Sequence, residues 1–202
     1  MKEQAKYFLG SIFEAKSAYN IWKMIVYSKY IHYVGEEMAN KYVEIQKTHA
    51  NFFKLVERSL LFHWVLVILH CFDDHRKDTY SLNKMDKKHY NEFLKNKDNR
   101  TTLKRLKDVR NSLLAHRAKI IKNSNLGSVE ELDLFFKNVE NLYNNIRHDL
   151  DSTGVLFNNA DDIKFDVESL FMNIEIANNI TKQETEDELL WWKNQKRISN
   201  IL

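Results

Sequence analysis

The absence of proline is the feature that most constrains this chain of 202 residues. Proline and glycine mark turns and linkers, and the chain has only four glycines, Gly10, Gly35, Gly127 and Gly154. A sheet of many strands needs many turns, whereas a few long helices need few. We therefore expect an all-α fold, and we consider β-rich and α/β enzyme folds largely excluded.

The apolar content predicts one sizeable core. Hydrophobic residues make up 44% of the chain and aromatic residues 12%, and we find no repeat, low-complexity tract or linker. The most apolar run, Leu60 to Phe72, is interrupted by two histidines and is shorter than the roughly 20 residues that span a bilayer. We expect a single domain over residues 1–202, with this run as a core helix rather than a membrane anchor.

Cysteine use and the N-terminal pattern predict a cytoplasmic protein. Cys71 is the sole cysteine and lies in the apolar run, so we interpret it as a small buried hydrophobe in a reducing compartment. Charged residues at Lys2, Glu3, Lys6 and Glu14 leave no continuous apolar stretch of the kind that a secretory signal has.

Local signals place the helices. Ser128 and Glu131 form the pattern of a capping box, which marks the start of a helix. Asp98 or Asn99 suits the N-cap of another helix, and Gly35 and Gly154 mark helix ends. Apolar periodicity then predicts helices over residues 2–33, 36–72, 82–96, 98–121, 128–153, 160–180 and 184–198.

Positive charge is concentrated in one segment, residues 95–122. It contains two aspartates, Asp98 and Asp108, and ten Lys or Arg, at positions 95, 97, 100, 104, 105, 107, 110, 117, 119 and 122. The segment is strongly basic, whereas the whole chain carries a net charge of only +3. Such a helix suits phosphate binding, although a solvated helix face would have the same composition.

Arg110 lies near the middle of the apolar stripe of this segment, as does Arg117. A guanidinium among leucines is costly unless it is paired or faces a partner, so we expect Arg110 either in a buried ion pair or at a site. Glu57 is one candidate for an internal acidic partner. His116 lies about 120° round the helix from Arg110, so two apposed helices of a dimer would bring both residues to a shared cleft more easily than one.

The stretch from Lys107 to Arg117, with Arg110, Asn111 and His116, resembles the Arg-polar-x4–6-His signature of the HEPN superfamily, in particular its abortive-infection AbiU-type branch. The steps Phe72-Asp73 and Ser81-Leu82 are also similar to that branch. The resemblance covers roughly residues 51–149.

The resemblance implies an up-and-down helical bundle, with a HEPN-like core over about residues 36–150 and additional helices in 1–35 and 155–202. It also implies a homodimeric, metal-independent endoribonuclease of an abortive-infection or toxin–antitoxin system, with RNA as substrate and a cognate antitoxin or other defence partner. No cofactor and no metal are expected. Ala118 replaces the tyrosine that nucleotidyltransferase antitoxins modify in related toxins, so we do not expect that regulation here.

The chemistry that the resemblance implies is attack by the RNA 2′-hydroxyl on the adjacent phosphorus. His116 would transfer protons, since its ordinary pKa is about 6.5, and Arg110 would stabilise the charge on the phosphate. Asn111 would orient the phosphate or the partner's motif. The basic side chains of Lys104, Lys107 and Arg117 would bind the substrate.

Two other functions compete with this hypothesis. A non-catalytic helical module would bind RNA, a nucleotide or a protein through the same basic helix, and a purely structural protein would use Arg110 only as an internal ion pair. The histidines His63 and His70 lack the spacing of a metal site, and we interpret them as core or interface residues. Trp191 and Trp192 could stack bases, but a pair that caps the core or contacts a partner is the preferred interpretation.

Overall fold

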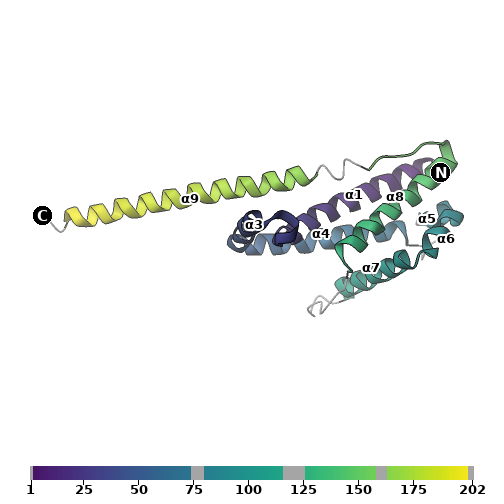
Figure 1. Ribbon diagram of the computed structural model, residues 1–202, viewed down its shortest axis with the longest axis horizontal. Helices are drawn as coiled ribbons and strands as arrows, with labels where there is room; N and C mark the ends of the chain where they lie inside the picture. Colours follow the sequence, from purple (N-terminus) through teal and green to yellow (C-terminus); the bar gives the residue numbers. More distant parts are fainter. Residues whose placement is uncertain (1, 74–79, 116–125, 158–162, 200–202) are drawn as a thin grey trace.

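The computed structural model describes residues 2–73, 80–115, 126–157 and 163–199, and within these residues the chain is helical and has no strand (Figure 1). The all-α fold class is therefore confirmed, as a helical bundle. The helices are α1 (Lys2–Tyr27), α2 (Ile31–Val34), α3 (Glu36–Thr48), α4 (Ala50–Cys71), α5 (Leu82–Met85), α6 (Lys87–Lys95), α7 (Lys97–Ala115), α8 (Val129–Asp151) and α9 (Ile163–Ser199).

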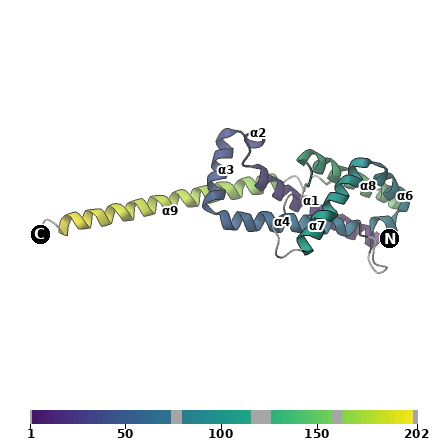
Figure 2. The same ribbon diagram turned by 90° about the horizontal axis from the view of Figure 1, so that it is seen from below.

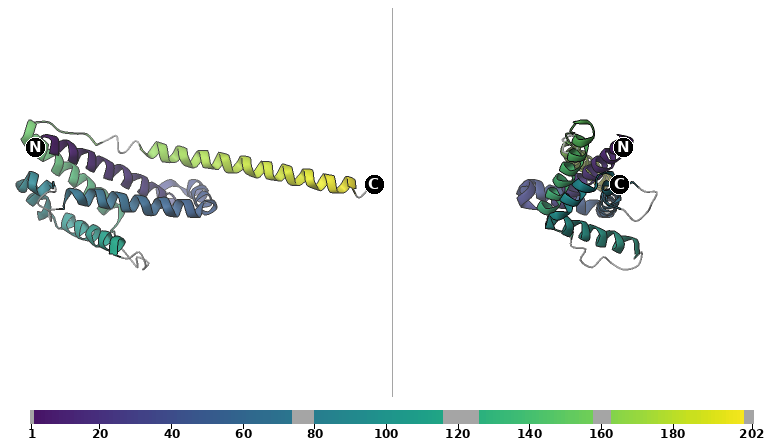
Figure 3. Two further views of the ribbon diagram at one scale, coloured as in Figure 1. Left: turned by 180° about the vertical axis from the view of Figure 1, so that it is seen from behind. Right: turned by 90° about the vertical axis from the view of Figure 1, so that its right-hand side faces the viewer.

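The centre of the bundle lies between α1, α4 and α8: α1 and α4 run alongside each other, and α8 crosses them obliquely and packs on α1 (Figures 1 and 3). The ring of Tyr19 stacks on Phe136 at 4.8 Å and meets the edge of Trp64 at 5.4 Å. The Tyr19 hydroxyl donates to Asp133 Oδ1 at 2.8 Å, and burial, followed by the charge of Asp133, raises the pKa of Tyr19. Cys71 is buried beside this core, as its apolar neighbours predict.

The expected helix over residues 36–72 is wrong in one respect, because the chain breaks it at His49. This residue has φ −115° and ψ 39°, which ends α3 and begins α4. Figure 2 shows α3 turned away from the line of α4. The turn brings Tyr42 and Ile45 of α3 against Phe171 of α9, so packing between distant segments explains the break.

Polar side chains cap two helix starts, of which the sequence predicted one. Ser128 and Glu131 form the predicted capping box, in which Glu131 N donates to Ser128 Oγ and Ser128 N donates to the Glu131 carboxylate. The expected helix over residues 82–96 is divided at Asp86, whose carboxylate accepts a hydrogen bond from His89 N at 3.0 Å and caps α6.

The last helix, α9, differs from expectation because it is one helix of 37 residues instead of two segments separated near residue 181. Its first part packs on a second core cluster, where Phe171 stacks on Phe53 at 5.4 Å and contacts Tyr42 at 4.3 Å. The rest of the helix extends away from the bundle (Figure 1). No helix of the described residues is both long and apolar enough to cross a membrane.

Candidate functional site

The basic helix α7 lies at the side of the bundle, where it packs against α4 and α8 (Figures 1 and 3). Leu103, Leu106 and Val109 are buried and form its inner face. Two polar residues fix its start. The buried Asn99 donates through Nδ2 to the Phe93 carbonyl at 3.0 Å, and the half-buried Asn138 of α8 donates through Nδ2 to Asn99 Oδ1 at 2.9 Å. The inner face therefore holds α7 in one position and rotation.

The outer face of α7 carries its positive charge. The helix contains six Lys or Arg and two Asp. Lys97, Arg100 and Lys104 are exposed, and Lys107 is half-buried one turn before Arg110. Because residues three apart share a helix face, Lys107 and Arg110 form one continuous basic surface. Such a surface attracts a phosphate backbone regardless of base sequence.

Arg105 has a structural role that its charge alone does not reveal. Its Nη1 donates to Glu131 Oε2 at 2.7 Å, and the same carboxylate oxygen accepts from Ser128 N at 2.9 Å. These bonds lower the pKa of Glu131, and the bond from the Ser128 backbone has the largest effect. Gly127 (φ 95°) makes room for this arrangement, since a Cβ there would collide with the Glu131 carboxylate. Arg105 thus joins α7 to the N-terminus of α8.

Arg110 forms an ion pair across the bundle surface. Its Nη1 lies 3.0 Å from Oδ2 of Asp73, the second residue after α4, and its Nε lies 3.5 Å from Asn111 Oδ1. The Arg110 side chain is 20% exposed and that of Asp73 is 33% exposed. The sequence correctly indicated that Arg110 needs a partner or a site, but its acidic partner is Asp73 instead of the candidate Glu57.

The pair holds the Arg110 guanidinium in a partly buried position that is still open to solvent on one side. A guanidinium carries five N–H donors, and the contacts to Asp73 and Asn111 involve its Nε and Nη1. Its fixed planar fork is well suited to binding two phosphate oxygens. Asn111 is exposed beside it, so both residues lie at the surface, at the end of α7 that leads toward residue 116.

The structure brings together only part of the predicted site. Arg110 and Asn111 are adjacent, and Lys107 and Lys104 follow in the direction of the N-terminus along α7. His116, the predicted proton-transfer residue, and Arg117, a predicted substrate-binding residue, lie outside the described residues. Asp73 was missed as a positioning residue. Its only sequence signal is the Phe72-Asp73 step, which was noted as a resemblance and not as a contact.

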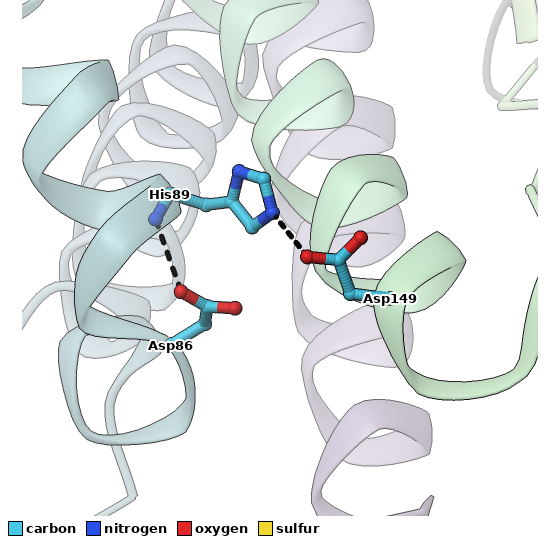
Figure 4. Close-up of side chains that lie close together, drawn as sticks. All are labelled: Asp86, His89 and Asp149. Carbon is cyan, nitrogen blue, oxygen red and sulfur yellow. Dashed lines mark hydrogen bonds and ion pairs between the residues drawn. The ribbon is translucent and has the colours of Figure 1, made fainter.

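A second polar cluster, Asp86, His89 and Asp149, has metal-ligand chemistry (Figure 4). One ligand atom from each residue lies within 4.8 Å of the others. His89 Nε2 lies 2.8 Å from Asp149 Oδ2, and this hydrogen bond is the main cause of the lowered pKa of Asp149. Asp86 caps α6 and the His89–Asp149 pair joins α6 to α8, so both contacts have a structural explanation.

His63, His70 and Trp191, which the sequence singled out, lie at the surface. His63 is exposed and 2.9 Å from Glu14, and His70 is exposed with its ring 6.0 Å from that of Tyr7, so neither is a core residue. Trp191 is exposed on α9 and does not cap the bundle core, and the side chain of Trp192 lies outside the described residues.

One pocket of about 500 Å³ lies between α1, α2, α3, α8 and α9. Tyr27, Tyr33, Tyr42 and Phe171 give it an aromatic lining, and Lys23 and Asp133 form an ion pair of 2.8 Å at its wall. None of its lining residues belongs to the basic helix α7.

Comparison of the chain with known protein families, with curated proteins and with solved structures finds no match. The case for a function therefore depends on the residues and geometry given above.

Proposed function

We propose that this protein is an endoribonuclease of an antiviral defence system, which cleaves RNA by attack of the 2′-hydroxyl and needs no metal. The observation that carries the proposal is the partly exposed guanidinium of Arg110, near the end of the basic helix and oriented by Asp73. The resemblance of the segment from Arg110 to His116 to the HEPN signature supports it. Its catalytic pair would be Arg110 and His116.

The basic residues on α7 have a role in this proposal. The exposed Lys104 and the half-buried Lys107 would bind phosphates next to the one that is cut. Arg110 would bind two oxygens of the scissile phosphate and stabilise the charge that develops there, while His116 exchanges protons. Asn111 would orient the phosphate. A twofold along residues 104–117 would place both copies of the pair at one cleft.

Cleavage of a structured RNA in the presence of EDTA tests this function. We expect 2′,3′-cyclic phosphate and 5′-hydroxyl ends. The His116→Ala and Arg110→Lys variants should each lower the rate on the order of 100-fold, since Arg110→Lys keeps the charge but loses the planar fork. Lys54→Ala, at an exposed lysine on α4, is the matched control and should cleave like wild type. Absence of cleavage by wild type would exclude the proposal.

The Asp73–Arg110 pair also favours a second candidate, a module that binds RNA without cutting it. The Asp73 carboxylate partly neutralises Arg110, so its charge would contribute to stability more than to chemistry. This candidate predicts salt-dependent RNA binding without product. It also predicts that Arg110→Lys leaves RNA binding nearly unchanged.

A further inference from the structure

A small polar pocket lies between α6, α8 and the start of α7, three helices that pack against one another (Figure 1). Its volume is about 240 Å³, which is less than the roughly 300–1,000 Å³ of sites for drug-sized ligands. Five of its lining residues are asparagines: Asn96, Asn99, Asn138, Asn141 and Asn145. Because a carboxamide both donates and accepts hydrogen bonds, the pocket suits one small ring with groups of both kinds.

The asparagines of α8 form a stripe on one face of the helix. Asn138, Asn141 and Asn145 follow one another at intervals of three and four positions. The residues that line the pocket from α6 are His89, Glu92 and Phe93. The stripe therefore places three carboxamides along the wall of the pocket that α8 forms.

Most of these carboxamides have groups left for a ligand. Asn99 uses both of its groups, since Nδ2 donates to the Phe93 carbonyl and Oδ1 accepts from Asn138. Asn138 Oδ1 and the exposed carboxamides of Asn141 and Asn145 have no hydrogen-bond partner among the described residues. A ligand with a donor beside an acceptor can therefore bind them and replace water without losing hydrogen bonds.

The charges in and around the pocket favour an uncharged ligand group. Among the described residues that line it, Glu92 is acidic and none is lysine or arginine. His89 is held by Asp149 at 2.8 Å (Figure 4). Exposed cations come directly after two of the asparagines along the chain, Lys97 after Asn96 and Arg100 after Asn99. This arrangement suits a nucleotide whose phosphate stays outside and whose base enters.

The pocket and Arg110 lie on the same side of α7. Positions 99 and 110 are 11 residues apart, which corresponds to three turns and about 20° of rotation, and to roughly 16 Å along the helix axis. A strand of RNA with one phosphate at Arg110 can therefore reach the pocket a few nucleotides away along the basic helix.

We propose that this pocket binds one unpaired adenine base of the RNA, a few nucleotides from the bond that is cut. A carboxamide presents a donor and an acceptor side by side, which match the amino group and the adjacent ring nitrogen of adenine. Guanine presents two acceptors and selects arginine or lysine, and the single ring of a pyrimidine fills less of the pocket. Proteins read unpaired RNA bases by such edge contacts. The inference rests on the proposed function, which supplies RNA as the ligand.

Binding of modified RNA octamers tests the base preference. The probes are 2′-O-methyl octamers of uridine in which one central uridine is kept or replaced by adenosine, guanosine or cytidine, and they lack the 2′-hydroxyl that cleavage needs. In a fluorescence titration, we expect the octamer with adenosine to bind on the order of 10-fold more tightly than the other three. Equal affinity of the four octamers, or a preference for another base, would overturn the proposal.

Matched variants separate base recognition from phosphate binding. Asn141→Ala and Asn145→Ala remove exposed carboxamides, so both variants should be folded by circular dichroism and each should reduce the preference for adenosine. Asn40→Ala, at an exposed asparagine of α3, should leave the preference unchanged. Lys97→Ala should weaken the binding of all four octamers alike, because a phosphate contact carries no base specificity. A preference that survives in both α8 variants would contradict the assignment to this pocket.

The cleavage assay in EDTA decides the proposed function separately, because its RNA keeps the 2′-hydroxyl. A protein that cleaves RNA but binds the four octamers equally would retain the proposed function and lack the adenine site. A protein that prefers adenosine but does not cleave would have the adenine site without the catalytic activity.

Discussion

The ion pair between Arg110 and Asp73 shows how far a single residue can be interpreted from sequence. Periodicity correctly placed Arg110 where a guanidinium needs a partner, because it falls within the apolar stripe of its helix. It could not identify the partner, since Asp73 reaches α7 only because α4 ends at Cys71. Glu57 was a candidate because it lies on the central helix, but which acidic side chain approaches Arg110 depends on where the helices end.

A double-mutant cycle measures the contribution of this pair to stability. Arg110→Ala removes the ion pair with the partly buried Asp73, so we expect a loss of about 1–2 kcal/mol in the free energy of unfolding. Asp73→Asn should cost less, and the double variant should cost less than the sum of the two single changes. Urea unfolding of all four proteins measures this. Additive effects would show that the two residues are not coupled.

Two glycines offer a matched test of local geometry. Gly127 has φ 95° and no room for a Cβ beside Glu131, so Gly127→Ala should destabilise the protein by about 1–3 kcal/mol. Gly10 is exposed within α1 and has nothing within 4 Å of a Cβ, so Gly10→Ala should stabilise it by about 0.5–1 kcal/mol. Thermal unfolding distinguishes these opposite signs, and destabilisation by Gly10→Ala would show that this account of α1 is incorrect.

At the scale of elements, the sequence predicted the start of α8 from its capping box, but it missed the cap of α6 at Asp86 and the helix break that depends on packing. Ser128 and Glu131 indicate the start of α8, because their spacing is that of a capping box. His49 has no such pattern, because α3 turns there to pack on α9. The expected gap near residue 181 was also wrong, because Lys182, Gln183 and Glu184 are polar but favour helix.

The hydrogen bond between His89 of α6 and Asp149 of α8 predicts that the stability of the protein depends on pH. The hydrogen bond from His89 is the main cause of the lowered pKa of Asp149, so the pair contributes stability above the unfolded carboxyl pKa of about 3.9. This contribution is lost as the pH falls through the lower folded-state pKa. We expect Asp149→Asn to lower the free energy of unfolding at neutral pH and to reduce the loss of that stability as the pH falls. Denaturation between neutral and acidic pH measures both, and identical curves for the two proteins would rule out this role.

At the scale of the whole molecule, the lack of proline and the few glycines correctly predicted an all-α bundle. They could not predict that α9 leaves the bundle, since its apolar residues have the periodicity of any amphipathic helix. The candidate site was predicted in part: Arg110, Asn111, Lys104 and Lys107 share α7, but only the folded chain adds Asp73. The course of α9 and the contact between Asp73 and Arg110 depend on how segments distant in sequence pack together.

The arrangement of charge over the molecule predicts salt-dependent RNA binding. Lys104 is exposed on α7, so Lys104→Ala should weaken binding and reduce the slope of log affinity against log salt by about 1. Lys54 is also exposed, on α4, and Lys54→Ala should leave the slope unchanged. Titration of a labelled RNA at several salt concentrations measures the slopes, and equal effects of the two variants would argue against α7 as the RNA surface.

The central claim is that Arg110, held by Asp73 at the end of the basic helix, takes part in RNA cleavage by the 2′-hydroxyl. The most direct measurement is the amount of 2′,3′-cyclic phosphate released from one RNA, in EDTA, by wild type and by Arg110→Lys. The account predicts that wild type releases this product and that the variant, although folded, releases on the order of 100-fold less. Equal release by the two proteins, or none by wild type, would contradict it.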